Sequence, residues 1–257
     1  MRSAAGYKWP MTQNIYDDPN FFAGYSQLRR SVQGLDGAPE WPALRALLPD
    51  VRGLDIVDLG CGYGWFCRWA AGQGARRVLG LDVSARMLQR AAQLDAEAGP
   101  QGAAITYTRA DLETLALPEA AFGLAYSSLA LHYLENLAGL LATVHRALLP
   151  GGRLVFSIEH PIYMASRHPD WITDAQGRRS WPVDSYQIEG ARRTDWLAPG
   201  VVKQHRTVGT LLNSVMHAGF TLAHVEDWGP TAAQLAAQPA LRDEQERPMM
   251  LLVAARR

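Results

Sequence analysis

Short apolar runs alternate with helical stripes over residues 54–158, and this alternation constrains the fold more than any other feature of the chain. Each run spans five or six residues, the length of a buried strand, and the stripes between them repeat apolar residues every three or four positions. The runs predict strands at 54–59, 77–81, 104–108, 122–127 and 154–158. Strands that alternate with helices form a mostly parallel sheet covered on both faces. The predicted fold class is α/β.

The helical stripes have recognisable limits. The spacing predicts helices that begin at Trp65, after Ser84, at Leu137 and at Thr207. The third carries apolar residues through Leu148 and should stop before Pro150-Gly-Gly. Two further apolar runs, 220–225 and 249–253, predict closing strands.

Residues 160–206 interrupt the alternation. They carry tryptophans and a tyrosine among prolines, glycines and charges, with no clear strand or helix period. A long irregular segment inside a compact domain is usually a functional lid or cap. We therefore divide the chain into an N-terminal lid segment (1–45), a main domain (46–159 and 207–257) and a cap insertion (160–206).

Charge and cysteine usage exclude several classes of protein. The 257 residues include 25 basic and 25 acidic side chains, so the basic excess of a duplex-binding protein is absent and no broad nucleic-acid binding is expected. The two cysteines, Cys61 and Cys67, make neither a disulfide framework nor a metal quartet, which suits a reducing cytoplasm. No apolar run approaches the roughly 18 residues of a membrane span, and no signal peptide is evident. We expect a soluble cytoplasmic protein without a metal site.

A glycine-rich loop follows the first predicted strand. In Asp58-Leu-Gly-Cys-Gly-Tyr-Gly64 the glycines permit a tight turn, and the helix that follows offers free N–H groups to a carboxylate or phosphate. Asp82 comes 22 residues after Gly60, at the end of the second strand, where a carboxylate can accept hydrogen bonds from ribose hydroxyls. A tight turn without a ligand is the alternative, and the paired acid makes it the weaker interpretation.

The spacing of the glycines distinguishes two kinds of nucleotide. The nicotinamide fingerprint requires its third glycine at position 65, which is Trp65, whereas the third glycine here is Gly64. With Asp58 before it, this loop resembles motif I of the class I S-adenosylmethionine-dependent methyltransferases. The later motifs of that family are matched in order by Leu79-Gly-Leu-Asp82, Arg109-Ala-Asp111-Leu112-Glu113, Ala125-Tyr-Ser127 through His132-Tyr133, and Leu149-Pro-Gly-Gly152.

The resemblance covers residues 53–158, and the remainder is similar to a bacterial type-11 subgroup through Ser157-Ile-Glu-His-Pro161, Lys203-Gln-His-Arg-Thr207 and Arg247-Pro-Met. One departure is Gly123, where the family often has an aspartate. The family fold is Rossmann-like, a mostly parallel seven-stranded sheet with helices on both faces. The implied cofactor is S-adenosyl-L-methionine, which leaves as S-adenosyl-L-homocysteine.

The resemblance also implies roles for individual residues. Gly60, Cys61 and Gly62 would pass the amino-acid end of the cofactor, and Asp82 would hold the ribose. The adenine would lie beside Val83 and Met87, with Asp111 and Leu112 bonding it, and Ser127 would lie under the sulfonium. An N-terminal helix closes over the cofactor in many relatives, with a tyrosine and an arginine. The candidates for that closure are Tyr16, Tyr25 and Arg30.

Methyl transfer from a sulfonium is an in-line displacement, and a base is needed only when the acceptor must lose a proton. His132, after the fourth strand, and His160, after the fifth, are the candidate catalytic residues, since open α/β sheets bind ligands at the carboxyl ends of their strands. Each histidine has an equally strong structural interpretation: His132 could bond a backbone carbonyl, and His160 could anchor the cap. The polar cluster Lys203-Gln-His-Arg206 could bind an acidic acceptor or be solvated.

The aromatic residues of the cap also have two interpretations: they could line an acceptor pocket or form a small core of the cap. They are Trp171, Trp181, Tyr186 and Trp196.

The neutral charge and the aromatic insertion favour an enzyme that methylates an N or O atom of a small-molecule acceptor. The alternatives are methylation of RNA or a carrier protein, and a non-catalytic module that only binds the cofactor.

Overall fold

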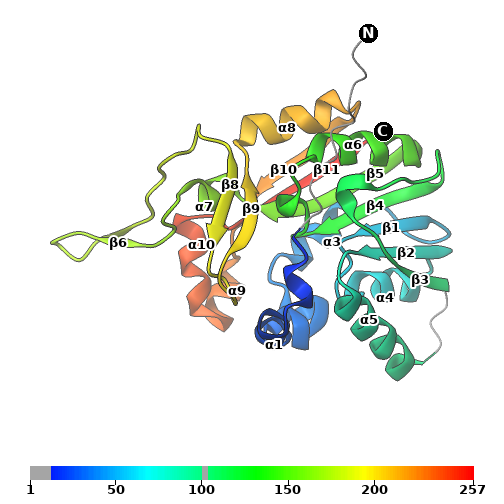
Figure 1. Ribbon diagram of the computed structural model, residues 1–257, viewed down its shortest axis with the longest axis horizontal. Coiled ribbons are helices and arrows are strands. Elements are labelled where there is room, and N and C mark those ends of the chain that lie inside the picture. Colours follow the sequence, from blue (N-terminus) through cyan, green and yellow to red (C-terminus); the bar gives the residue numbers. More distant parts are fainter. Residues whose placement is uncertain (1–12, 100–103) are drawn as a thin grey trace, which may run out of the picture.

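The computed structural model describes residues 13–99 and 104–257; residues 1–12 of the predicted lid lie outside them. A seven-stranded sheet forms its centre, in the order β10-β11-β5-β4-β1-β2-β3, as Figure 1 shows. The strands are β1 (Asp55–Leu59), β2 (Arg77–Asp82), β3 (Ala104–Arg109), β4 (Phe122–Ser128), β5 (Leu148–Glu159), β10 (Thr221–Asp227) and β11 (Met250–Arg256). The first five are parallel, and β11 is antiparallel to both β5 and β10. The α/β prediction is confirmed.

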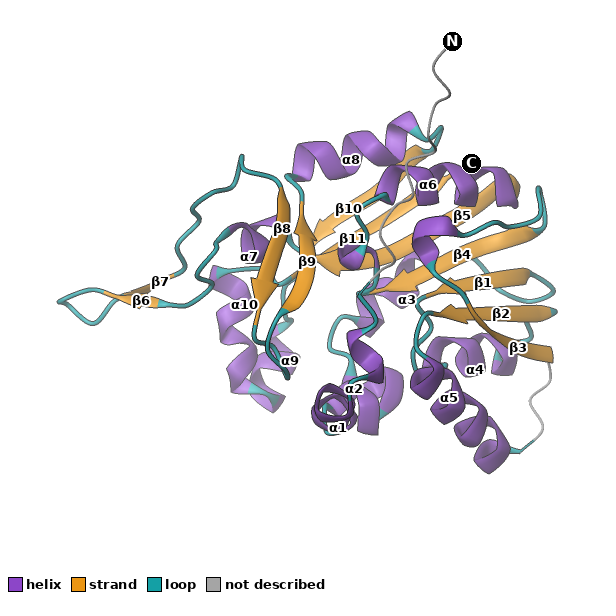
Figure 2. Cartoon of the chain, in the orientation of Figure 1, coloured by secondary structure: helices purple, strands orange, loops and turns teal. Residues whose placement is uncertain are grey.

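Helices cover both faces of this sheet (Figure 2). One core layer packs leucines of α6 (Leu137–Ala147) and α8 (Val208–His217) against side chains such as Val57 and Leu59. The opposite layer packs α3 (Trp41–Leu47) and α4 (Trp65–Gly72) against Ile56. Neighbouring residues of β1 thus serve opposite faces, as the alternation of a strand requires. Helix α5 (Ala85–Ala98) begins at Ser84, whose hydroxyl accepts the Met87 N–H and caps it.

One predicted boundary is wrong. The third helix was expected to include Leu148, but α6 ends at Ala147, and Leu148 is the first residue of β5. Leu148 pairs with Phe122 of β4, and the register then shifts across Pro150-Gly-Gly before pairing resumes. The Pro-Gly-Gly segment therefore forms an irregularity within β5, because β4 pairs with the residues on both sides of it. A local sequence pattern does not show this pairing.

The segment without a sequence period contains regular structure. It holds helix α7 (Pro161–Ala165), the pair β6 (Ile172–Thr173) and β7 (Arg179–Ser180), and the pair β8 (Gly190–Thr194) and β9 (Val201–His205). Arg192 of β8 is buried, and its guanidinium donates hydrogen bonds to the backbone carbonyls of Ala165, Ser185 and Ile188. Contacts between distant parts of the segment thus hold it together.

Two elements lie beyond the end of the sheet toward which β1, β2 and β4 point (Figure 2). One is the N-terminal pair of helices, α1 (Pro19–Ser26) and α2 (Arg29–Val32); the other is the β8–β9 ribbon. Helices α9 (Ala232–Ala237) and α10 (Asp243–Glu246) precede β11. No helix in the described part of the chain is long and apolar enough to cross a membrane.

The start of α4 depends on a glycine. Gly64 has φ +71°, and a Cβ there would lie 2.2 Å from the Tyr107 hydroxyl oxygen. We predict that Gly64→Ala lowers the free energy of unfolding by about 2–4 kcal/mol, through left-handed strain and overpacking. Gly72→Ala is the control, since its Cβ would meet nothing within 4 Å. Urea unfolding measures both, and equal stability of the two variants would contradict the assignment.

Candidate functional site

The glycine loop and Asp82 are joined by hydrogen bonds. Asp82 ends β2 and is buried; one carboxylate oxygen accepts the Gly62 N–H at 2.9 Å, and the other accepts the Ser84 N–H at 2.9 Å. Burial raises the pKa of Asp82 to about 6, because the charged form loses hydration. The same carboxylate therefore fixes the loop after β1 and the start of α5, and it remains mostly ionised at neutral pH.

Two glycines of the loop are required for different reasons. A Cβ at Gly60, where φ is +80°, would lie 2.4 Å from the Cβ of Ala130. At Gly62, where φ is +53°, the nearest atom to a Cβ would be the Tyr25 hydroxyl oxygen, 3.9 Å away. Gly60 thus permits close packing against the segment after β4. Gly62 borders open space, where a ligand can approach the backbone.

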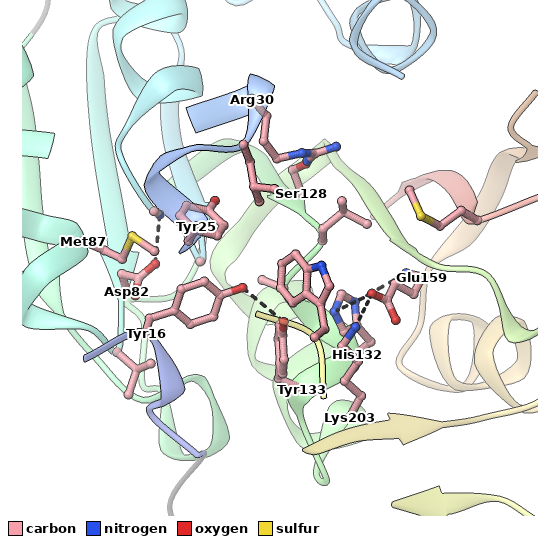
Figure 3. Close-up of a pocket in the computed structure, with 18 of the residues that line it drawn as sticks. Tyr16, Tyr25, Arg30, Asp82, Met87, Ser128, His132, Tyr133, Glu159 and Lys203 are labelled. Atoms are coloured by element: carbon pink, nitrogen blue, oxygen red, sulfur yellow. Dashed lines mark hydrogen bonds and ion pairs between the residues drawn. The ribbon is translucent and has the colours of Figure 1, made fainter. Parts of the chain in front are cut away.

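A cavity of about 350 Å³ lies at this end of the sheet. Ten of the predicted site residues border it: Tyr16, Tyr25, Arg30, Gly60, Gly62, Asp82, Val83, Met87, Leu112 and His132. Figure 3 shows Asp82 and Met87 on one side of this cavity and His132, Glu159 and Lys203 on the other. The structure thus brings residues predicted to bind the cofactor into the same cavity as a polar group formed by His132, Glu159 and Lys203.

Three predicted cofactor residues do not line that cavity. Cys61 borders a smaller adjoining pocket instead. Asp111 is half-buried, and its carboxylate accepts the Glu113 N–H at 3.0 Å. Ser127 is fully buried and donates its hydroxyl to the Leu59 carbonyl at 2.7 Å, so that the neighbouring Ser128 is the residue that faces the cavity.

The N-terminal segment is attached directly beside Asp82. Asp17 accepts hydrogen bonds from the Ser84 hydroxyl at 2.5 Å and from the Arg86 N–H at 3.1 Å, at the start of α5. Tyr16 shares a hydrogen bond of 3.1 Å with the hydroxyl of Tyr133, across the cavity. These contacts hold the segment over the strand ends.

Arg30, also on this segment, is neutralised by a buried acid. Its guanidinium donates to both carboxylate oxygens of Glu40, at 2.9 and 3.1 Å. Glu40 is only 1% exposed. Arg30 can therefore offer its remaining N–H groups to a ligand while its charge stays balanced.

The second polar group consists of His132, Glu159 and Lys203. Lys203 of β9 donates to Glu159 Oε1 at 2.5 Å, and the two side chains are 4% and 14% exposed. His132 Nε2 lies 3.9 Å from the same oxygen. Glu159 was not predicted as a site residue. Its position at the carboxyl end of a predicted strand, where open α/β sheets bind ligands, could have indicated it.

His132 has an unusual environment. Burial lowers the pKa of its imidazole to about 4, and the nearby carboxylate of Glu159 offsets only part of that effect. Its Nδ1 accepts the Glu159 N–H at 3.4 Å, so that the neutral ring carries its proton on Nε2. The nitrogen that could accept a proton thus already faces a backbone donor.

His160 is placed away from the cavity. Its Nδ1 accepts the Ile162 N–H at 3.0 Å, which caps α7, and its Nε2 pairs with Asp227 at 2.7 Å. These contacts correspond to the anchoring interpretation and join the cap to β10.

Only some residues of the polar cluster 203–206 and of the aromatic set in 160–206 border the cavity among the described residues. Lys203 and Trp196 border the cavity, whereas His205 donates to the Tyr186 carbonyl and Arg206 donates to the carbonyls of Leu134 and Glu135. Trp171 and Trp181 pack around the guanidinium of Arg247. Among residues 13–99 and 104–257, no group of three or more metal-ligating side chains is found.

Comparison with known proteins agrees with this geometry. Residues 57–156 match the family described as a methyltransferase domain. A crystal structure of an S-adenosylmethionine-dependent methyltransferase from Mesorhizobium loti is 63% identical, with a TM-score of 0.82 over 87% of this chain and all of that one. A Listeria monocytogenes protein assigned to the same class is 38% identical, with a TM-score of 0.79 over 87% of this chain and 99% of that one.

One relative that matches over part of its length has a name that states its methyl acceptor. The malonyl-[acyl-carrier protein] O-methyltransferase of Pectobacterium atrosepticum is 38% identical over 157 residues, which are 61% of this chain. The chain spans only about half the length of that relative, 53%.

The loop, its paired acid and the sheet order are found in a chain that is similar to solved methyltransferases over 87% of its length. This chain belongs to the type-11 family of S-adenosylmethionine-dependent methyltransferases, and it is an enzyme whose cofactor is S-adenosylmethionine.

Proposed function

We propose that this methyltransferase transfers the methyl group to an N or O atom of a small-molecule acceptor held in the cavity described above. One observation carries the proposal: a single cavity extends from Asp82 to the Glu159–Lys203 pair. Its lining includes Tyr25 and Arg30 of the N-terminal helices and Lys203 of the β8–β9 ribbon, and a cavity enclosed in this way suits a small molecule better than a long polymer. We accordingly propose that residues 13–45, the described part of the predicted segment 1–45, act as a lid, and that 160–206 form the acceptor-binding cap.

The residues at the Asp82 end fit the cofactor. The open space beside Gly62 admits its amino-acid portion, and the buried carboxylate of Asp82 can accept the ribose hydroxyls. Val83, Met87 and Leu112 supply an apolar surface for adenine. Asp111 precedes Leu112 and would have to reach the adenine from outside the cavity lining. Gly60 and Cys61 shape the loop, Ser127 supports the strand end, and Tyr16, Tyr25 and Arg30 close the site from the lid.

The bound cofactor supplies a methyl group on a positively charged sulfur, which is a good leaving group. The chain therefore acts mainly by positioning: it holds the acceptor in line with the methyl carbon and keeps water away. The aromatic wall formed by Tyr16, Tyr133 and Trp196 suits both tasks, because it is apolar and closely packed.

The role of His132 follows from its surroundings. A neutral imidazole whose pKa is about 4 is a weak base at neutral pH, and its free nitrogen faces a backbone N–H. We infer that His132 acts as a positioning residue beside Glu159. His160 then acts only as an anchor of the cap.

We predict that Asp82→Ala weakens S-adenosylmethionine binding by about 1–3 kcal/mol, because the ribose hydroxyls lose a charged acceptor. Calorimetry measures the affinity, and thermal unfolding checks that the variant is folded. Asp50→Ala is the matched control, since Asp50 is exposed and pairs with nearby Arg52. Unchanged affinity in folded Asp82→Ala would contradict the ribose assignment.

Cofactor binding should also depend on pH through Asp82. Burial raises the pKa of this carboxyl to about 6, so below pH 6 it is increasingly protonated and loses acceptor capacity. We expect weaker binding at pH 5 than at pH 8, with a plateau above about pH 7. Calorimetric titrations across this range on the wild type and Asp82→Asn separate this effect from others, because the amide does not titrate. The same pH dependence in both proteins would exclude Asp82 as its source.

For His132→Gln we expect at most about a tenfold loss of turnover, with unchanged cofactor affinity, because a positioning residue transfers no proton. The pH profile of kcat should likewise show no step that the variant removes. A loss of about 10²–10⁴-fold together with a missing step would instead identify His132 as the general base.

A further inference from the structure

We propose that Glu159 and Lys203 form the acceptor-recognition pair of this enzyme, and that they select an acceptor bearing an N–H or O–H donor over one bearing a carboxylate. The inference rests on the proposed function, because it places the acceptor in the cavity shared with the cofactor. It adds the chemical class of the acceptor and the residues that discriminate it.

The two side chains reach the cavity from different parts of the chain. Glu159 is the last residue of β5 in the sheet, and Lys203 lies in β9 of the cap. Both border the cavity, on the side opposite Asp82 in Figure 3. The pair therefore lies where an acceptor would enter beside a cofactor that is held by Asp82.

The hydrogen bonds of Glu159 are incomplete. Oε1 accepts Lys203 Nζ at 2.5 Å, whereas the buried Oε2 has no hydrogen-bond partner among the described residues. His132 Nε2 does not complete the set, since it lies 3.9 Å from Oε1. A buried carboxylate oxygen is costly to leave without a donor. As placed, this oxygen is closed off from the cavity that Glu159 borders, so a group in the cavity can donate to it only if the carboxylate turns.

The terminal torsion of a glutamate is broad, so the carboxylate can turn its open oxygen toward a bound group at low cost. An amine or a hydroxyl offers the required hydrogen. A carboxylate acceptor, ionised at neutral pH, offers none and would face Glu159 as a like charge.

The charge of Lys203 is already balanced. Its ammonium pairs with Glu159 and lies 5.0 Å from the centre of the Trp196 ring. The other cations that border the cavity are Arg29 and Arg30, both on α2. Arg30 pairs with Glu40, and Arg29 donates to Gln33 and Gln238. Among the described residues, the cation paired with Glu159 is Lys203, so a carboxylate placed beside Glu159 would meet a positive charge that is already balanced.

The test compares three probes that share one aromatic ring: aniline, phenol and benzoate. Calorimetry measures their binding to the enzyme saturated with S-adenosylhomocysteine, so the readout does not depend on turnover. We expect aniline and phenol to bind at least about tenfold more tightly than benzoate, because only they can donate to Glu159. Methyl transfer from S-adenosylmethionine to each probe is measured separately.

Glu159→Gln should reverse this preference. Removing the carboxylate should weaken aniline and phenol binding by about 10- to 100-fold. It also frees the charge of Lys203, so benzoate binding should improve. Glu246→Gln, an identical change at an exposed glutamate of α10, is the matched control and should preserve the wild-type order.

Three results would overturn the proposal: benzoate binding to the wild type as tightly as the donor probes, no binding of either donor probe at millimolar concentration, or an equal loss for all three probes in Glu159→Gln. Loss of benzoate binding in Arg29→Gln would assign a carboxylate acceptor to α2 and count against Glu159. If Glu159→Gln does not fold, the order of the probes on the wild type still decides. Absence of any S-adenosylhomocysteine binding would instead refute the cofactor site, so the two failures are distinguishable.

Discussion

The carboxylate of Asp82 is the constraint on which the cofactor end of the site depends. It receives one N–H from the glycine loop and one from the start of α5, so two segments that follow different strands are fixed to one buried group. The Asp17 carboxylate binds the same helix start and brings the N-terminal segment over the cavity. The burial that makes this junction rigid also raises the pKa of Asp82 to about 6. If Asp82 binds the ribose as we propose, architecture and ligand affinity are coupled through this one side chain.

The opposite side of the cavity is organised by the ion pair between Glu159 and Lys203. A buried ion pair contributes little net stability, because desolvation of both charges offsets their attraction. Its consequence here is positional, because it links the end of β5 to the β8–β9 ribbon at the cavity. One side of the cavity therefore presents a loop and an acid suited to a nucleotide, and the other presents a neutralised pair beside aromatic rings.

Local patterns predicted the seven strands, and most of the residues predicted to bind the cofactor border the cavity, but Glu159 was not among the predicted site residues. Glu159 ends β5 and borders the cavity, whereas the adjacent His160 caps α7 and pairs with Asp227. The sequence does not reveal which of the two faces the cavity. The sequence-based prediction of His132 as a base assumed that its imidazole has the ordinary pKa, near neutral pH. Complete enclosure lowers that pKa to about 4, an effect that depends on neighbours distant in the chain.

The sequence by itself determined the α/β fold, the glycine loop and its paired acid, because each is encoded in a short stretch whose spacing has few physical solutions. Tertiary structure decided the rest. The register shift at Leu148 depends on β4, and the cap depends on Arg192, which donates to carbonyls up to 27 residues away. The Glu159–Lys203 pair joins residues 44 positions apart. Such contacts depend on how the chain folds back on itself, and no local pattern of residue types records that.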